Sequence, residues 1–169
     1  MVVAHHVHQP RRLMPGETLE GFSCGVPPID AWAAERAPSA AQYGTAVVYA
    51  SFVDDATESD APQEVAGFYT LSAYSVERSS VAGGWLRRNT PDRIPAILIG
   101  MLGVSRQCQG EGLGWQLLQD AIMRPRRISR QLGSRAIIVE PYDDSARSFY
   151  EHFGFCPIPG SNSMYLRLA

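Results

Sequence analysis

Three glycines alternate along a short segment between an apolar run and an amphipathic stretch. The segment is Gln109-Gly110-Glu111-Gly112-Leu113-Gly114, and the apolar run ends at Val104. Glycine lets the backbone adopt positive φ angles and approach a ligand closely. A helix that begins at Leu113 would present unpaired N–H groups and a positive dipole end to this turn. Such a turn could hold a pyrophosphate group without any lysine side chain.

The glycine turn alone leaves other interpretations open. A tight turn without any ligand is one of them. A Walker A site is excluded, because no Gly-Lys-Ser or Gly-Lys-Thr sequence follows the turn. A dinucleotide-binding site would require the turn to open a βαβ fold, with an acidic residue at the end of the next strand. Glu140 lies near the end of the next expected strand, so this alternative remains.

A second group of residues, at 146–155, could supply an acid. Phe149 and Phe153 have the spacing of one helix face and are expected to pack inward. Tyr150 lies beside that face, so its ring can be half buried while its hydroxyl reaches a cleft. A tyrosine hydroxyl is a suitable acid for protonating a thiolate leaving group. Spacing alone nevertheless favours a structural aromatic whose hydroxyl is satisfied within the protein.

Regular elements must position these residues, and the sequence predicts them at intervals along the chain. Apolar and β-rich patterns predict strands at 45–53, 64–76, 96–104, 136–139 and 165–168. Helical periodicity predicts helices at 27–37, 113–132 and 144–153. The first two strands are expected to form an antiparallel pair, joined by an acidic loop at 54–63. The nearly continuous apolar run at 96–104 predicts a central strand covered on both faces.

Proline, glycine and aspartate residues predict where the helices begin and end. Pro38 is expected to stop the first helix, and Pro125 to kink or split the second. Gly133 is expected to cap the end of the second helix. Asp143 or Asp144 is expected to cap the start of the third. The irregular stretch at 78–95 is expected to hold a short helical turn around its tryptophan.

Length and composition describe a globular protein. The chain has 169 residues, of which 45% are hydrophobic and 19% charged, and this suits a single domain at 1–169. The element order predicts a mixed α/β (α+β) fold, in which helices flank one mostly antiparallel sheet. No stretch approaches the roughly 20 apolar residues that a membrane span requires, so no membrane association is expected. We interpret the scattered Cys24, Cys108 and Cys156 as reduced thiols of a cytoplasmic protein, and expect no metal site.

The distribution of charge is more informative than the net charge of −2. The sequence contains no lysine, and its acidic residues cluster at 54–64. Guanidinium groups suit contacts with phosphate. A GC-rich genome that replaces lysine with arginine explains the same bias equally well. The stretch from Ala121 to Val139 holds no acid and five arginines, namely Arg124, Arg126, Arg127, Arg130 and Arg135.

Taken together, the glycine turn and the aromatic segment resemble the GNAT acetyltransferases. The acetyl-CoA loop of that family follows Gln/Arg-x-x-Gly-x-Gly/Ala, which Gln109, Gly112 and Gly114 match. The later helix of the family commonly reads Ala-x-x-Phe-Tyr-x-x-x-Gly-Phe, and the segment at 146–155 matches it. One expected helix and one expected strand separate the two motifs, as in the family. The resemblance covers residues 96–168.

This resemblance implies a GNAT fold and a geometry for acetyl transfer. Backbone groups of Leu102, Gly103 and Val104 would align the pantetheine arm of acetyl-CoA, and the segment at 109–114 would hold its pyrophosphate. An amine would attack the thioester directly, without an acyl-enzyme. Tyr150 would then protonate the departing thiolate. Asp143 stands where many family members have asparagine.

Most of the chain also resembles one subgroup, the TacT-like toxins of toxin–antitoxin pairs, which acetylate aminoacyl-tRNA. A Phe-x-Cys-Gly segment precedes the first helix of that subgroup and is matched at 22–25. A strand similar to Val-Ala-Gly-Phe-Tyr-Thr-Leu-Ser is found at 65–72, and Pro-x-x-Leu-x-Gly-x-Leu-x-Val at 95–104. Met101 stands where the subgroup often has arginine.

The subgroup resemblance implies partners as well as a substrate. It implies acetylation of the α-amine of aminoacyl-tRNA and a block of translation, a ribbon-helix-helix antitoxin and a homodimer. The near-neutral charge does not support a tRNA substrate, since an enzyme that acts on tRNA is usually more basic. An alternative is a GNAT acetyltransferase for a small amine or a protein N-terminus, whose acidic acceptor pocket would lie in the segment 54–64. The residues expected to contact the tRNA backbone are Arg124, Arg127 and Arg130, with Arg87, Arg88 and Arg93 as a second patch.

Overall fold

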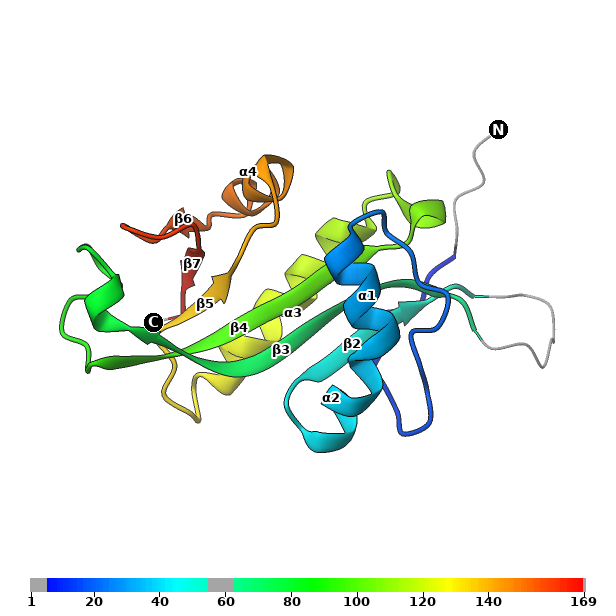
Figure 1. The fold of residues 1–169 in the computed structure, drawn as a ribbon, viewed down its shortest axis with the longest axis horizontal. Coiled ribbons are helices and arrows are strands. Elements are labelled where there is room, and N and C mark those ends of the chain that lie inside the picture. The colour runs from blue at the N-terminus through cyan, green and yellow to red at the C-terminus, as the bar shows by residue number, and fades with distance from the viewer. Residues whose placement is uncertain (1–5, 55–62, 169) are drawn as a thin grey trace. The chain divides into compact units, whose positions relative to one another are not determined.

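The structure of the chain is a computed structural model that describes residues 6–54 and 63–168. Within these residues one seven-stranded sheet has the strand order β1-β2-β3-β4-β5-β7-β6 (Figure 1). The strands are β1 (Arg11–Arg12), β2 (Val47–Phe52), β3 (Val65–Glu77), β4 (Arg93–Val104), β5 (Ala136–Val139), β6 (Cys156–Pro157) and β7 (Met164–Arg167). The helices are α1 (Pro27–Glu35), α2 (Ala37–Tyr43), α3 (Leu113–Ile128) and α4 (Asp144–His152). The predicted mixed α/β fold is confirmed.

The strand pairing that the sequence predicted is present, and two further pairings lie in the second unit. β2 and β3 are antiparallel, with Val47 opposite Leu71, as the two β-rich segments predicted. β4 and β5 are parallel, with a register that runs from Ala96 opposite Ala136 to Ile99 opposite Val139. β5 is antiparallel to β7. Most of the acidic loop expected at 54–63 lies outside the described residues.

The chain divides into two compact units. The first unit comprises residues 1–71 and 101–121, and the second comprises residues 72–100 and 122–169. β3, β4 and α3 each contribute one part to each unit, whereas α1, α2 and β2 belong to the first and α4, β5 and β7 to the second. The glycine turn therefore lies in the first unit, and the aromatic segment at 146–155 lies in the second.

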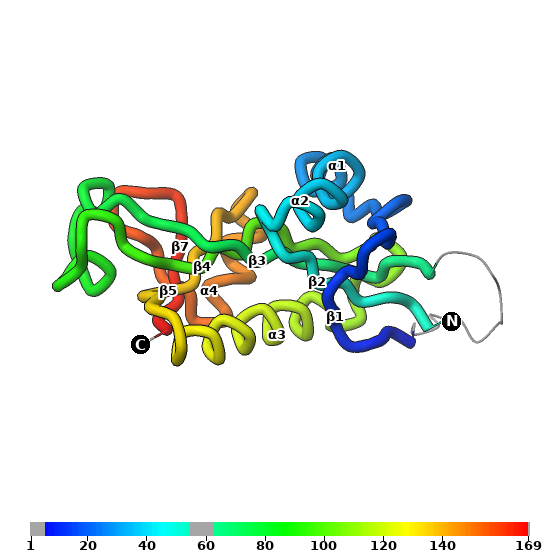
Figure 2. The backbone as a smooth tube through the Cα atoms, turned by 90° about the horizontal axis from the view of Figure 1, so that it is seen from below, coloured from blue at the N-terminus to red at the C-terminus, as the bar shows by residue number. Residues whose placement is uncertain are grey.

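In the first unit, successive side chains of β3 point to opposite faces of the sheet, and helices pack on both of these faces. Phe68 is fully buried on one face, where its ring meets Phe22 edge-on at 4.9 Å and stacks on Trp32 of α1 at 6.1 Å. Gly67 faces the other side, and a Cβ atom there would lie only 2.7 Å from Leu117 of α3. Figure 2 shows α1 and α2 on one side of β2 and β3 and the start of α3 on the other. Neighbouring residues thus serve opposite faces, as a strand requires.

In the second unit, Trp85 organises the segment between β3 and β4. Its ring stacks on Tyr165 of β7 at 5.9 Å, and the guanidinium of Arg135 lies 3.8 Å from its centroid on a cation–π contact. The Arg135 side chain also donates to the carbonyl of Trp85 at 2.7 Å. The amide of Arg88 donates to Gly84, so the short turn expected around the tryptophan is present.

Two predicted helix ends are wrong, the one at 37 and the one at 132. Pro38 does not stop a helix, because α1 already ends at Glu35 and Pro38 lies in the first turn of α2. The first turn tolerates proline, since its N–H groups have no helical acceptor. Pro125 lies inside α3 without splitting it, and α3 ends at Ile128 rather than at 132. Gly133 is therefore too far from the helix end to cap it.

Candidate active site

The glycine turn leads from β4 into α3 within the first unit. A short 3₁₀ turn at Arg106–Cys108 follows β4, and α3 begins at Leu113. Gly110 and Gly112 both have a φ of +81°, the left-handed conformation that glycine adopts without strain. A Cβ atom at either position would meet nothing within 4 Å. The backbone angle therefore demands glycine here, and the space beside both residues is open.

The start of α3 supplies backbone donors to this turn. The helix has 16 residues, so its dipole and its first N–H groups are directed toward the turn that precedes it. The amide of Gln116 donates to the carbonyl of Gly112, the residue just before the helix. The N–H groups of Leu113 and Gly114 precede the first intrahelical bonds and suit an anion. This is the strand, turn and helix order that the sequence predicted.

The side chain of Gln109 is directed away from this role. Its Nε2 donates to the carbonyl of Cys24 at 2.9 Å and to the carbonyl of Val104 at 3.0 Å. Val104 is the last residue of β4, and Cys24 precedes α1. Gln109 therefore joins the turn to two other parts of the first unit through its side chain.

The cysteines of the first unit do not resemble catalytic nucleophiles. Burial raises the pKa of Cys24 to about 11. Burial also raises the pKa of the Cys108 thiol above its usual value, and the nearby charges of Glu111 and Glu64 add to that shift. Both side chains are therefore neutral thiols near pH 7, whereas a thiolate is the reactive species. This agrees with direct attack on a thioester rather than transfer through a cysteine.

Tyr150 is held by aromatic packing on α4 in the second unit. The Asp143 carboxylate accepts from the amide of Ala146 at 2.8 Å, which confirms the predicted cap and fixes the start of the helix. The Tyr150 ring packs edge-on against Phe149 at 5.5 Å and Phe155 at 5.4 Å, and only 8% of the residue is exposed.

The hydroxyl of Tyr150 is a neutral donor. Among the described residues it has no hydrogen-bond partner. The buried environment raises the pKa of Tyr150 to about 12, because burial penalises the charged phenolate. The hydroxyl therefore carries its proton throughout the physiological pH range. The satisfied hydroxyl expected of a purely structural aromatic is not found.

A second tyrosine of the same unit bonds an acidic side chain. The hydroxyl of Tyr74 on β3 donates to Glu140 at 3.3 Å. Burial raises the pKa of Tyr74 above its usual value, and the Glu140 charge and hydrogen bond raise it further. Glu140 directly follows β5, as expected, and Glu151 is exposed on α4. Nothing in this arrangement makes either acid a clear general base.

All six arginines predicted to contact tRNA lie in the second unit. Arg127 and Arg130, at the end of α3 and just beyond it, are exposed. Arg87 is partly engaged within the protein, since its guanidinium donates to the carbonyl of Val81 at 3.1 Å. The guanidinium of Arg93 lies 3.8 Å from the Glu77 carboxylate, and both side chains are well exposed.

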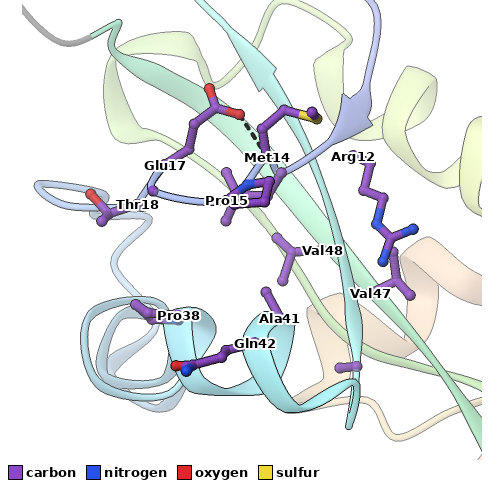
Figure 3. A pocket seen from close by; sticks show the side chains of 13 residues that line it. Arg12, Met14, Pro15, Glu17, Thr18, Pro38, Ala41, Gln42, Val47 and Val48 are labelled. Carbon is purple, nitrogen blue, oxygen red and sulfur yellow. Dashed lines mark hydrogen bonds between the residues drawn. The ribbon is translucent and has the colours of Figure 1, made fainter.

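A cavity of about 790 Å³ in the first unit is separate from the glycine turn. It lies between the segment 12–18, α2 and the start of β2, and none of the predicted site residues lines it (Figure 3). A double hydrogen bond between Arg11 and Glu17, at 2.7 and 2.8 Å, closes the loop along one side. The sequence alone does not reveal this cavity, because its walls come from two parts of the chain, 12–18 and 38–48, that only the fold brings together.

Two further features of the described residues concern metals and membranes. No group of three or more histidine, cysteine, aspartate or glutamate side chains in the described ranges could hold a metal ion. No helix within these ranges combines the length and the apolarity needed to cross a membrane.

Comparison with models of known protein families shows which family the chain belongs to. The model of the acetyltransferase (GNAT) domain matches residues 44–157, more than half of the chain and including both the glycine turn and the aromatic segment. The chain belongs to the GNAT acetyltransferase family. The matched region spans both units, so the turn, the end of β4 and Tyr150 all lie in the part of this GNAT enzyme that the family model describes.

Relatives of this GNAT enzyme include two named toxins. The tRNA-acetylating toxin of Mycobacterium tuberculosis (strain ATCC 25618 / H37Rv) is 38% identical over 86% of this chain and 82% of that protein. A probable toxin TacT of Sinorhizobium fredii (strain NBRC 101917 / NGR234) is 28% identical over 87% of this chain and 81% of that protein. The resemblance to the TacT-like toxins is therefore confirmed.

A solved structure confirms the fold. A tyrosine-to-phenylalanine mutant of the toxin AtaT, bound to the C-terminus of the antitoxin AtaR and to acetyl-CoA, superposes with a TM-score of 0.78. The match covers 96% of this chain and 93% of that chain at 22% identity. At this identity the likeness establishes the GNAT fold.

Proposed function

We propose that this enzyme transfers the acetyl group of acetyl-CoA to the α-amine of aminoacyl-tRNA, and that it thereby blocks translation as a toxin. The observation that carries the proposal is the 38% identity to a tRNA-acetylating toxin across 86% of this chain. The strand, glycine turn and helix of the first unit support it, because they provide backbone donors for the pyrophosphate. We treat residues 1–169 as one acetyltransferase domain.

Acetyl-CoA is the co-substrate in this proposal, and the backbone of this chain binds it. Backbone groups of Leu102, Gly103 and Val104 align the pantetheine arm, and the turn from Gln109 to Gly114 receives the pyrophosphate. The open space beside Gly110 and Gly112 supports this assignment. The neutral thiols of Cys24 and Cys108 favour direct attack of the amine on the thioester carbon.

Tyr150 is the proposed acid. The amine nitrogen forms the new C–N bond, the C–S bond of the tetrahedral intermediate breaks, and the thiolate leaves. The Tyr150 hydroxyl donates to that sulfur as negative charge develops on it. A pKa of about 12 supports this role, since it keeps the donor protonated at every physiological pH. The absence of a hydrogen-bond partner among the described residues leaves the hydroxyl available to a ligand.

The acceptor amine does not need a strong base. An α-amino group has a pKa of about 7.7–8.0, against about 10.4 for a lysine side chain. A substantial fraction of it is therefore neutral near pH 7 and can attack the thioester. Water can take the proton that the amine loses.

The arginines of the second unit are the proposed contacts with the tRNA backbone. The set consists of Arg124, Arg127 and Arg130 with Arg87, Arg88 and Arg93. The exposure of Arg127 and Arg130 supports a role in binding phosphate. Because Arg87 already donates to Val81, we expect its contribution to be smaller than theirs.

Partners and location follow from the same proposal. We infer a cytoplasmic homodimer that is inhibited by a ribbon-helix-helix antitoxin. An acidic antitoxin tail would compete with tRNA for the same arginines. The solved structure of the AtaT mutant bound to the C-terminus of AtaR supports docking through the end of an antitoxin chain.

The alternative acceptor is a small amine or a protein N-terminus, because the net charge of −2 does not support a tRNA substrate. Its acidic pocket would come from the segment 54–64, of which residues 55–62 lie outside the described residues.

One experiment separates the two acceptors. The protein is incubated with labelled acetyl-CoA and a mixture of charged tRNAs, then with uncharged tRNA, polyamines and a peptide with a free N-terminus. We expect label on the amino acid of charged tRNA alone. Label on the polyamine or the peptide, with none on charged tRNA, would establish the alternative.

A further inference from the structure

Hydrogen bonds connect the residues that precede α1 to the glycine turn and to α1 itself. The side chains that make these bonds have no role yet in the proposed function. The Asp30 carboxylate accepts from the amides of Cys24 at 2.8 Å and Gly25 at 3.3 Å. The amide of Arg106, just after β4, donates to the carbonyl of Ser23 at 2.9 Å. Gln109 donates to the carbonyl of Cys24. We call Ser23, Cys24, Gly25, Asp30 and Gln109 the Cys24 clamp. All five lie in the first unit.

The donor count of Gln109 shows what its side chain can do. A primary amide has two N–H donors and one carbonyl acceptor. Both donors have partners, at 2.9 Å on Cys24 and at 3.0 Å on Val104. Only Oε1 remains, and an acceptor oxygen is repelled by phosphate oxygens. The Gln109 side chain is therefore unsuited to be a phosphate ligand while it makes these two bonds.

Close packing makes the clamp specific to these residues. A Cβ atom at Gly103 would lie 3.1 Å from both Phe22 and Ile29 and 3.4 Å from the sulfur of Cys24. Gly25 has a φ of +91°, and a Cβ atom there would lie 3.2 Å from the Arg106 side chain. The end of β4 thus packs directly on the segment before α1.

Charge supports the clamp as well. Burial raises the pKa of Asp30, but the hydrogen bonds from Cys24 and Gly25 outweigh this, so its pKa lies below the usual value. The carboxylate is therefore ionised near pH 7 and holds the two amides strongly. The clamp joins a charged acceptor on α1 to the turn through a single backbone residue, Cys24.

We infer that Gln109 is a positioning residue, whose side chain orders the acetyl-CoA turn by fastening it to Cys24 and Val104. The inference rests on the proposed function, in which that turn receives acetyl-CoA. It assigns a role to the Phe-x-Cys-Gly segment, namely to supply the carbonyl that anchors the turn. It also makes the position of α1 and the order of the acetyl-CoA turn depend on each other.

The test compares two ligands that differ in the pyrophosphate. Dissociation constants of acetyl-CoA and of S-acetylpantetheine, which has no pyrophosphate, are measured for the parent protein and for Gln109→Ala. Loss of two hydrogen bonds should weaken both ligands by about tenfold, because Val104 on the pantetheine side is released together with the turn. A loss confined to acetyl-CoA would mean that the side chain acts at the pyrophosphate alone, and it would overturn the part of the inference in which the bond to Val104 positions the pantetheine side of the site. Equal binding by the variant and the parent would overturn it too.

Two further variants change the hydrogen bonds of the clamp, and acetyl-CoA affinity is measured for each. Asp30→Asn weakens the opposite end of the clamp, so the double variant with Gln109→Ala should bind acetyl-CoA more tightly than the product of the two single losses predicts. Strict additivity would contradict the inference. Gln109→Glu keeps the size of the side chain but replaces its two N–H donors by a carboxylate oxygen, which the carbonyls of Cys24 and Val104 repel. The Gln109→Glu variant should therefore lose more acetyl-CoA affinity than the Gln109→Ala variant. Full affinity in this variant would also contradict it.

Controls separate this inference from the proposed function. Gln119→Ala removes an exposed glutamine of α3 outside the clamp and should bind both ligands like the parent. Melting temperatures are recorded for every variant. A parent protein that does not bind acetyl-CoA would refute the proposed function, whereas a parent that binds and a Gln109→Ala variant that binds equally would refute only the role of Gln109.

Discussion

The two units hold their candidate site residues by different forces. In the first, the turn around Gly112 depends on left-handed backbone angles and on hydrogen bonds that reach Cys24 and Val104. In the second, Tyr150 is fixed by the rings of Phe149 and Phe155, without a polar partner among the described residues. The turn should therefore be sensitive to any added side chain. Removal of the Tyr150 hydroxyl should leave the packing of its ring unchanged but should slow acetyl transfer.

Tyr150→Phe gives the largest expected effect on activity. The ring and its packing remain, so acetyl-CoA affinity and the melting temperature should stay at parent values. Loss of a general acid should slow transfer by about 10²–10⁴-fold. Single-turnover acetylation of charged tRNA measures the rate, and growth after induced expression measures toxicity.

Tyr142→Phe is the matched control for Tyr150→Phe. Tyr142 is 58% exposed in the same unit, so removal of its hydroxyl should leave the rate unchanged. Transfer within a few-fold of the parent by the Tyr150 variant would make that tyrosine structural, with water as the proton source. The second unit would then supply no proton donor to the reaction, contrary to our proposal.

Gly112→Asp should abolish most acetyl-CoA binding, with a loss of about a thousandfold in affinity. A left-handed angle costs an L-residue roughly 1–2 kcal/mol. A carboxylate about 4 Å from a phosphate adds a repulsion of about 4 kcal/mol at an effective dielectric constant of 20. Calorimetry with acetyl-CoA measures the change.

Gly21→Asp separates strain from charge in that experiment. Gly21 also has a positive φ, of +79°, with nothing within 4 Å of a built Cβ atom, but it lies outside the turn. Its variant should lose stability and keep its affinity for acetyl-CoA. Undiminished binding by Gly112→Asp would remove the turn from the site and end the contrast between the two units.

Charge reversal at Arg127 and Arg130 tests the second unit as a surface for anionic partners. The double variant to glutamate should weaken binding of charged tRNA and flatten its salt dependence by about one unit of slope for each phosphate that the protein no longer neutralises. A pull-down with the product of the adjacent gene should weaken in parallel. Arg36→Glu in the first unit is the control, and an effect of equal size there would point to net charge alone.

The smallest expected effect concerns the helix that carries Tyr150. Asp143→Ala removes the side-chain acceptor for the Ala146 amide and should cost about 1 kcal/mol of stability. For a chain of this size the melting temperature should fall by about 2–4 °C. Asp144→Ala in the first turn is the control, because Asp144 accepts no capping bond. Equal losses from both variants would argue against Asp143 as the cap.

The sequence predicted those features that depend on short-range patterns. Alternating glycines marked the turn, the apolar run marked β4, and an aspartate three residues before Ala146 marked the start of α4. β1 and β6 escaped prediction because each has only two residues, which is too short for any periodicity. The boundary between α1 and α2 was missed because proline is compatible with a helix start as well as with a helix end.

The clamp could not be predicted from local pattern. Gln109 and Cys24 are 85 positions apart, and only the fold brings the side chain of one to the carbonyl of the other. The family motif located Gln109 but not the partner of its side chain. The same reason applies to the cavity beside α2, whose walls meet only in the folded chain.

The arginine that covers Trp85 has a consequence for an enzyme that acetylates amines. Arg135 provides the cation of that contact, and a guanidinium has no free lone pair with which to attack a thioester near pH 7. A lysine in its place would be a competing acceptor inside the enzyme itself. Because the whole sequence contains no lysine, no side chain of this protein offers an amine to its own co-substrate. Acetylation of its own lysines therefore cannot compete with transfer to the substrate, however much acetyl-CoA surrounds the enzyme.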